Sequence, residues 1–141
     1  MTVTGTSEWY GTFREGKGTL STTTDTLSGT PYTFASRFEG APGAIPEELL
    51  ATGHAGCFNH ALANISGQND LTVESVTTAV ELSMGTDDHG PAITKIHVTT
   101  TARIPGASQE KFQEIAEGAR AWCAFSKALS VEITMDATLV G

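Results

Sequence analysis

The segment from Pro46 to Gly67 has helical spacing, yet apolar or small residues occupy nearly all of its faces. Its apolar stripe carries Leu50, His54, Cys57, Phe58, Ala61, Leu62 and Ile65. Small residues fill most of the remaining surface: Ala51, Gly53, Ala55, Gly56 and Ala63. A helix that is apolar all round is buried on all sides, which a single chain of 141 residues rarely achieves. We therefore expect a two-fold dimer with this helix inside a joint core.

Segments with the alternation of half-buried strands surround this helix. After residue 70 they run from Val76 to Met84, from Ile96 to Ile104 and from Val131 to Leu139, and the polar stretch 85–91 predicts a hairpin loop between the first two. The N-terminal third also indicates strands, at residues 9–14 and 32–34, with a turn at residues 16–18. A second helix is expected from its N-cap Ser108 to Cys123. The pattern predicts one α+β domain, residues 1–141, with a mostly antiparallel sheet.

The charge balance excludes several classes of partner. Eight Lys and Arg residues stand against 16 Asp and Glu, a net charge of −8, and the basic residues are scattered singly. Such a chain offers no basic stripe for phosphates, so we expect neither nucleic acid nor a membrane surface as a partner. The sequence has no run of the roughly 18 apolar residues that span a bilayer. Its start has no signal-peptide pattern, which predicts a cytoplasmic protein.

The two cysteines carry the clearest chemical signal. Thiols are mostly kept reduced in the cytosol, where a cysteine pair is more often catalytic, redox-sensing or metal-binding than structural. Cys57 and Cys123 both lie on the apolar stripe of a predicted helix. If the two helices pack together, a Cα separation below about 7 Å would permit a disulfide. A reactive thiol with a second, resolving thiol is typical of a redox enzyme or sensor. Two small buried core residues are the alternative.

A reactive thiolate requires a cation or hydrogen-bond donors. Among the four arginines, Arg14, Arg37, Arg103 and Arg120, we favour Arg37, which lies where a strand gives way to the Gly/Pro-rich loop before the first helix. The carboxylates of Glu47 and Glu48 lie at the N-terminus of that helix, where the positive end of the helix dipole stabilises them. Glu47 stands ten residues before Cys57, about 15 Å along a continuous helix. For Glu47 to act on the chemistry, either the helix breaks at Thr52-Gly53 or, as we favour, the carboxylate serves the partner chain's thiol.

A metal site is a further alternative. His54, Cys57, His60 and Cys123 would make a two-Cys, two-His set. The three helical members spread over about 120° of the helix surface, which is too wide for one tetrahedral ion. We therefore expect no metal. His89 and His97 are interpreted as turn and exposed-face residues.

Four sequence blocks, in this order and spacing, resemble the OsmC/Ohr family of thiol peroxidases. They are Ser36-Arg37-Phe38-Glu39-Gly40, Pro46-Glu47-Glu48-Leu49-Leu50, residues 51–58 (ATGHAGCF) and residues 121–126 (AWCAFS). The Arg-Phe-Glu-Gly block ahead of the Pro-Glu-Glu-Leu block is closer to the OsmC branch than to the Ohr branch. The family commonly has proline after its second cysteine, whereas this chain has Ala124.

The resemblance implies an intertwined homodimer, with antiparallel sheets wrapped around central helices and two sites at the subunit interface. Cys57 would be the peroxidatic cysteine, Arg37 the cation that holds its thiolate, Glu47 the carboxylate that positions Arg37, and Cys123 the resolving cysteine. An organic hydroperoxide would be the substrate, and a dithiol, such as a lipoyl group on a carrier protein, the reductant. No metal, haem or flavin cofactor is implied.

Two other functions use the same residues. An apolar wall of Phe58, Ile65, Trp122 and Phe125 would suit an alkyl peroxide, but it would also suit a redox-responsive protein that binds an apolar ligand without turnover. The third possibility is a structural domain with inert cysteines. Peroxide consumption separates the first two, and the rate of thiol alkylation in the native protein identifies the third.

Overall fold

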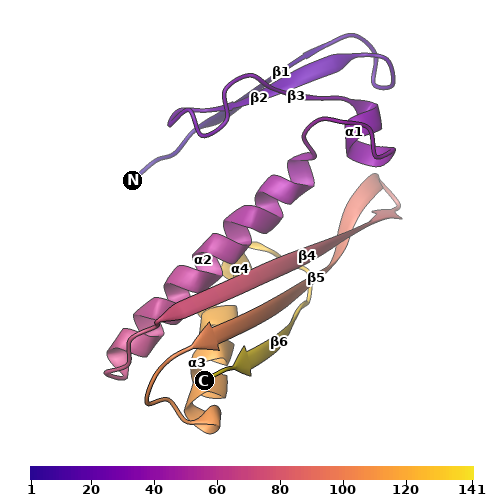
Figure 1. Ribbon diagram of the computed structural model, residues 1–141. Helices are drawn as coiled ribbons and strands as arrows, with labels where there is room; N and C mark the ends of the chain where they lie inside the picture. The colour runs from indigo at the N-terminus through magenta and orange to yellow at the C-terminus, as the bar shows by residue number, and fades with distance from the viewer. The chain divides into compact units, whose positions relative to one another are not determined.

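The computed structural model describes residues 1–141 and divides into two compact units, Met1–Glu48 and Leu49–Gly141. Each unit combines a three-stranded sheet with helix. Figure 1 labels these elements. The predicted α+β class is therefore confirmed. The single domain 1–141 stays a prediction, and the two units are described separately.

The first unit is built on an antiparallel sheet of β1 (Gly5–Tyr10), β2 (Lys17–Thr22) and β3 (Thr30–Tyr32). The expected strand at residues 9–14 is wrong beyond Tyr10, because Gly11 turns the chain with φ 101°. The backbone amide of Gly16 then donates to the carbonyl of Thr12 (2.8 Å). The turn thus precedes the predicted one at residues 16–18. Gly18 instead lies in β2, where a Cβ would come within 2.6 Å of the Trp9 and Tyr32 rings.

The strand predicted at residues 32–34 ends at Tyr32, the last residue of β3, and a short helix, α1 (Phe34–Phe38), follows it. Thr33 and Ser36 form a capping box: the Ser36 amide donates to Thr33 Oγ1 (2.9 Å), and the Thr33 amide donates to Ser36 Oγ (2.8 Å). This local pairing satisfies backbone donors that would otherwise be unpaired at a helix start. It outweighs the strand propensity of the aromatic residues.

The long helix α2 (Pro46–Gln68) has its first three residues in the first unit and the rest in the second. In the second unit it lies beside the sheet β4-β5-β6 (Figure 1). β4 (Ser75–Asp87) pairs antiparallel with β5 (Gly90–Arg103), and β6 (Ile133–Leu139) joins β5 in parallel. The loop predicted at residues 85–91 is wrong: pairing continues to Asp87 and Gly90, because Gly90 adopts φ 119° and permits a tight turn. β6 begins two residues later than predicted.

The core of the second unit lies between one face of this sheet and two helices, α2 and α3 (Gln109–Trp122). The Ser108 N-cap of α3 is confirmed by its hydrogen bond from the Lys111 amide (3.1 Å). The buried core residues are Phe58 and Leu62 of α2, Val98 and Ala102 of β5, Ile104, and Phe112, Ile115, Ala116 and Ala119 of α3. Trp122 departs from the predicted stripe, since it is 71% exposed.

Cys123 stands between two helices. It is the C-cap of α3 and the N-cap of α4 (Ala124–Ala128), with an extended backbone at ψ 138°. The chain therefore changes direction at this cysteine, whose side chain is buried in the second unit.

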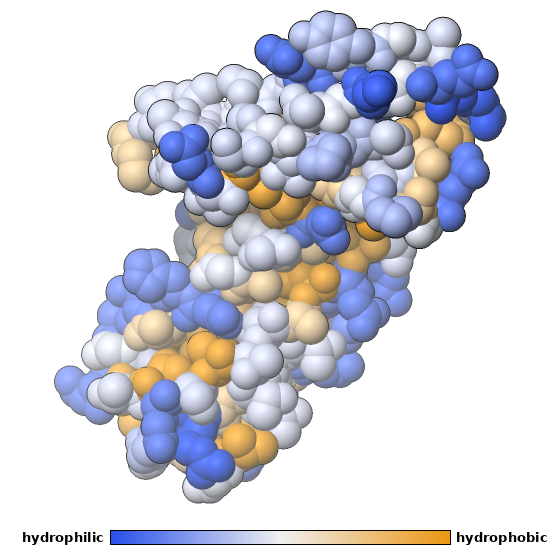
Figure 2. Space-filling model, turned by 45° about the horizontal axis from the view of Figure 1, so that its top comes forward, coloured by the Kyte–Doolittle hydropathy of each residue, from blue (hydrophilic) through white to orange (hydrophobic).

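Apolar side chains also reach the surface in both units (Figure 2), among them Phe13, Phe38 and Trp122. Within α2 the fully buried residues are His54, Phe58, Leu62 and Ser66, while Leu49, Leu50 and Ile65 are only partly covered. The dimer stays a prediction. None of the helices combines the length and apolar character needed to cross a membrane.

Candidate active site

The predicted site residues lie in two groups, one in each unit. Arg37 and Glu47 meet in the first unit. Cys57 and Cys123 meet in the second unit. Each group is described by its own contacts below.

Arg37 and Glu47 form a half-buried ion pair. Arg37 Nε donates to Glu47 Oε1 (2.7 Å), and Nη2 donates to the same oxygen. The guanidinium also lies over the Phe38 ring, with 4.8 Å from Cζ to the ring centroid. The side chains of Arg37 and Glu47 are 31% and 12% exposed. A carboxylate and an aromatic face therefore hold the cation in one orientation while part of it stays open to a ligand.

Local sequence explains why these side chains meet. Arg37 is in the last turn of α1 and Glu47 in the first turn of α2, where each charge is favoured by its helix dipole. The loop between them folds back because Ser36 Oγ donates to the Ala44 carbonyl (2.9 Å). Gly43, with φ 133°, packs so closely that a Cβ would lie 2.9 Å from the Ser36 Cβ. The family resemblance implied that Glu47 positions Arg37, and the two side chains do form an ion pair; their roles in catalysis stay predictions.

An aromatic pocket of about 220 Å³ adjoins Arg37. Its lining residues are Trp9, Phe13, Tyr32, Thr33, Phe34, Arg37 and Phe38. Phe13 and Phe34 meet edge to face with ring centroids 5.1 Å apart, and Arg14 lies over the Phe34 ring. Tyr10, which follows Trp9 in β1, is 67% exposed and does not line this pocket.

The Cys57 thiol lies in α2, half-buried and beside Cys123. Burial raises its pKa, but hydrogen bonds from the backbone amide of Phe125, the Cys123 thiol and the backbone amide of Ala124 act against this, and the positive charge of Lys127 adds to them. The net effect is a Cys57 pKa below its ordinary value. The first turn of α4 and a neighbouring thiol thus supply the stabilising donors that a reactive thiolate requires.

Cys123 has the opposite character. Burial raises its pKa; hydrogen bonds from the Ser126 amide and hydroxyl and the Phe125 amide lower it, while its hydrogen bond to Cys57 raises it again. The result is a Cys123 pKa above its ordinary value. Of two adjacent free thiols, Cys57 is therefore the one that ionises first and Cys123 the one that keeps its proton.

Both cysteines line an open pocket of about 540 Å³. It is lined by Cys57, His60, Ala61, Ala63, Asn64, Trp122, Cys123 and Ala124. Of the predicted apolar wall only Trp122 lines it. Phe58 lies fully in the core, Ile65 packs against that core, and the Phe125 ring stacks on His54. The prediction failed because it took one helical stripe as one surface, whereas Cys57 and Phe58 project about 100° apart around the helix axis.

His54 is buried beside Ser126. It is 1% exposed, and its Nε2 lies 3.0 Å from Ser126 Oγ. No group of three or more His, Cys, Asp or Glu side chains is arranged to hold a metal ion. Burial holds the pKa of His54 below its usual range. Ser126 was not singled out from the sequence, although its place three residues after Cys123, within one helical turn, was a usable signal.

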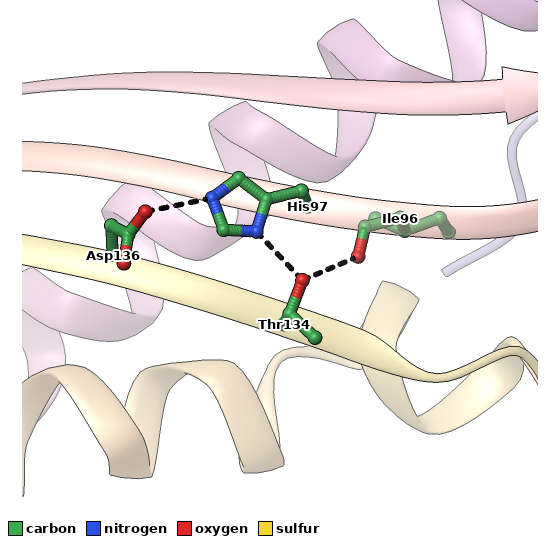
Figure 3. Close-up of polar contacts among 4 residues, drawn as sticks. All are labelled: Ile96, His97, Thr134 and Asp136. Carbon is green, nitrogen blue, oxygen red and sulfur yellow. Dashed lines mark hydrogen bonds and ion pairs between the residues drawn. The ribbon is translucent and has the colours of Figure 1, made fainter.

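A second polar cluster joins β5 and β6 (Figure 3). His97 Nδ1 lies 2.6 Å from Thr134 Oγ1, and its Nε2 lies 3.1 Å from Asp136 Oδ2. The Thr134 hydroxyl also approaches the Ile96 carbonyl (3.5 Å). These contacts bridge paired strands, and Asp136 is 80% exposed, so the cluster contributes little more than surface ion pairs do. His97 lies on the polar sheet face, as predicted, but it is half-buried.

The helix that bears both Glu47 and Cys57 is continuous. α2 runs without interruption through Thr52 and Gly53, so the possibility of a break there is wrong. The idea that Glu47 serves the thiol of a partner chain stays a prediction. Residue roles in catalysis are likewise predictions.

The chain is similar in sequence to a known protein family. Residues 39–138 match the family described as "OsmC-like protein", a range that includes Glu47, Cys57 and Cys123 and begins two residues after Arg37. The chain is 40% identical to the peroxiredoxin OsmC of Escherichia coli (strain K12) over 132 residues, 94% of this chain and 92% of the relative. It is 34% identical over 91 residues to the organic hydroperoxide resistance protein OhrB of Bacillus subtilis (strain 168), 64% of this chain and 65% of that protein.

Solved structures agree on the fold. An OsmC-like protein of unknown function from Vibrio cholerae aligns with a TM-score of 0.76 and 16% identity, over 97% of this chain and 99% of that chain. The crystal structure of Bacillus subtilis OhrB aligns with a TM-score of 0.67 and 24% identity, over 97% and 98%. The expected OsmC-like fold is confirmed, and together with the sequence matches it shows that this chain belongs to the OsmC-like family.

Proposed function

We propose that this protein reduces organic hydroperoxides to alcohols, with Cys57 as the attacking thiolate and Cys123 as the resolving thiol. The curated names of its relatives, peroxiredoxin and organic hydroperoxide resistance protein, indicate a thiol-dependent peroxidase. One observation carries the assignment of roles. Two free thiols touch, and their surroundings lower the pKa of one and raise that of the other.

The proposed chemistry follows from this asymmetry. The Cys57 thiolate attacks one oxygen of the hydroperoxide, the O–O bond breaks, and the alkoxide leaves and takes up a proton as an alcohol. Cys57 is then a sulfenic acid. The Cys123 sulfur attacks the Cys57 sulfur, the S–O bond breaks, and the hydroxyl departs with the thiol proton as water. An external dithiol reduces the resulting disulfide through exchange; a lipoyl group on a carrier protein is one such reductant.

Arg37 and Glu47 complete the proposed site from a second subunit. Glu47 and Cys57 stand ten residues apart on one continuous helix, about 15 Å by helical rise, so a straight α2 does not bring both to one peroxide. A homodimer, for which the poorly covered α2 is suited, allows the ion pair of one chain to face the thiols of another. There the guanidinium would stabilise the thiolate and the oxygen on which negative charge develops.

The pocket favours an organic substrate. Ala61, Ala63, Trp122 and Ala124 present apolar surface beside the two sulfurs, which gives an alkyl or aryl group a site that hydrogen peroxide cannot use. We expect a higher kcat/KM for cumene hydroperoxide than for hydrogen peroxide. Equal or better turnover of hydrogen peroxide would contradict this. Two reduced thiols at rest suit a reducing compartment such as the cytosol.

Mass spectrometry of the protein after one equivalent of cumene hydroperoxide tests the mechanism. We expect the loss of two hydrogens, mapped to a Cys57–Cys123 disulfide, and the gain of one oxygen on Cys57 in Cys123→Ser. An unchanged mass in the parent protein would refute the proposal. In a coupled assay with dithiothreitol or dihydrolipoamide, a protein that only binds apolar ligands would consume no more peroxide than Cys57→Ser.

A further inference from the structure

The imidazole of His54 is held rigidly against α4. Its ring stacks on Phe125 with centroids 6.0 Å apart and an interplanar angle of 18°. The Phe125 ring in turn fits against Gly53, where a Cβ would lie 2.9 Å from two ring carbons. Because His54 is also 1% exposed, its orientation is set by packing rather than by solvent.

The two ring nitrogens of His54 differ in their contacts. Nε2 lies 3.0 Å from Ser126 Oγ, whereas Nδ1 is buried and has no hydrogen-bond partner. An orphaned N–H is rarer in protein interiors than an under-satisfied acceptor. The favoured tautomer of this neutral imidazole therefore carries its hydrogen on Nε2 and donates it to Ser126 Oγ.

Ser126 links His54 to the proposed resolving cysteine, Cys123. A hydroxyl that accepts from His54 has its own hydrogen available for another acceptor. The Cys123 sulfur is the acceptor at hand, because the Ser126 side chain acts on that thiol and lowers its pKa. His54, Ser126, Cys123 and Cys57 thus form one continuous series of interacting polar groups from the core to the pocket.

We propose that His54 and Ser126 are positioning residues for disulfide formation, with the His54 Nε2–H holding the Ser126 hydroxyl so that it donates to the Cys123 sulfur as that sulfur becomes the nucleophile. The inference rests on the proposed peroxidase cycle. It assigns to these residues the second step alone, since their nearest reacting atom is the Cys123 sulfur and the first step takes place on Cys57.

The step is balanced without an extra reactant. The Cys123 thiol gives up its proton, its sulfur forms the S–S bond to Cys57, and the S–O bond of the sulfenic acid breaks. The departing hydroxyl and the thiol proton leave as water, so Cys123 is oxidised and the Cys57 sulfur is reduced. Ser126 and His54 donate hydrogen bonds but neither gains nor loses a proton. This suits a buried histidine whose pKa is lowered by burial.

Other ionisable groups near these sulfurs are few. From α2 they are Cys57 itself and His60, which lines the same pocket. From α4 the group is Lys127, whose charge acts on Cys57. Arg120 of α3 and Glu132 line a separate pocket together with Ser126. Removal of the Ser126 hydroxyl leaves all of these in place, so its effect on Cys123 can be separated from theirs.

Rapid-quench mass spectrometry with one equivalent of cumene hydroperoxide tests the proposal, because it follows the oxygen adduct and the disulfide separately. In Ser126→Ala we expect the adduct to form within about twofold of the parent rate, and the disulfide to form roughly 10- to 100-fold more slowly, the effect of one hydrogen bond to a charged group. The pH profile of disulfide formation in Ser126→Ala should move to higher pH. His54→Phe, which keeps an aromatic ring for stacking, should behave alike, and His54→Gln, which keeps an N–H donor, should restore most of the rate.

Ser130→Ala is the matched control, since Ser130 is exposed and lies outside α4; it should form the disulfide at the parent rate. Thiolate absorbance in a Cys57→Ser background supplies a readout without peroxide, in which Ser126→Ala should raise the titration midpoint of Cys123. Parent-like disulfide formation and an unmoved midpoint in Ser126→Ala would overturn the proposal, whether or not His54→Phe folds. Failure of the parent protein to form any disulfide would instead refute the peroxidase cycle.

Discussion

The two units hold their functional groups by different physical means. In the first unit the buried residues are all small, namely Gly18, Ser36 and Ala44, and its order comes from a capping box, an ion pair and aromatic contacts near the surface. In the second unit large side chains such as Phe58, Leu62 and Phe112 are fully buried between sheet and helices. The thiols of Cys57 and Cys123 are therefore held by a packed core, whereas the Arg37 guanidinium is held by contacts near the surface. Core substitutions in the second unit should mainly lower stability, and substitutions of Arg37 should mainly lower activity.

Phe112→Ala should have the largest effect. Removing a fully buried ring leaves a cavity in the core of the second unit, and we expect a loss of about 3–5 kcal/mol in the free energy of unfolding, measured by urea denaturation. Phe13→Ala is the comparison in the first unit. Phe13 is 61% exposed, so its loss should stay below about 1.5 kcal/mol. Equal losses would mean that Phe13 is buried in solution, as a partner subunit would bury it.

Arg37→Ala should show the reverse pattern. The loss of one charge-stabilising group should lower kcat/KM for cumene hydroperoxide about 10²- to 10³-fold. The unfolding free energy should fall by only about 1–3 kcal/mol, because the substitution leaves Glu47, 12% exposed, without its partner. Arg14→Ala removes an equal charge that also stacks on an aromatic ring, and it should keep nearly full activity. Peroxidase activity that survives Arg37→Ala would remove Arg37 from the site.

Gly53→Ala and Gly67→Ala place the same methyl group at two points of α2. At Gly53 the new Cβ would lie 2.9 Å from the Phe125 ring, and this overpacking should cost roughly 1–3 kcal/mol, less the helix-propensity gain. At Gly67 nothing lies within 4 Å, so the substitution should stabilise by about 0.5–1 kcal/mol. Thermal unfolding of both variants measures the difference. A stabilised Gly53→Ala would show that the Phe125 ring moves easily.

The smallest effect concerns pH and His54. Because burial lowers the pKa of His54 in the folded state, the unfolded chain binds this proton more readily. Its stabilising contribution is thus complete above the unfolded value of about 6.5 and is lost as the pH falls below it. The slope from one proton is at most about 1.4 kcal/mol per pH unit. Urea midpoints between about pH 7 and pH 5 should fall less steeply in His54→Gln than in the parent.

The sequence predicted the class of fold because periodicity reports burial. The strands at Val76 and Ile96 and the helix after Ser108 alternate or repeat as the structure requires. The prediction failed where a single local contact determines the backbone conformation. Thr33 and Ser36 cap a helix in a segment with strand composition, and Gly90 allows the tight turn that shortens the expected hairpin loop.

For the site, the sequence indicated which residues are candidates, but it did not indicate what surrounds each of them in the fold. Nothing in the spacing of Cys57 and Cys123 shows which thiol ionises first, because that depends on backbone amides supplied by Phe125 and Ala124 after the chain turns at Cys123. Likewise His54 has the sequence position of a candidate ligand. Only its stacking on Phe125 and its contact with Ser126 reveal a buried donor instead.

The parallel pairing of β6 with β5 has a consequence for how the chain is made. The pairing of β4 with β5 joins neighbours in the sequence and can form early, whereas β6 must return after residues 104–132 to pair beside β5. Cys123 lies within that returning segment. During synthesis Cys57 therefore emerges well before its partner thiol, and we expect the nascent chain to pass through a stage in which an exposed cysteine has no resolving neighbour and depends on the reducing power around the ribosome.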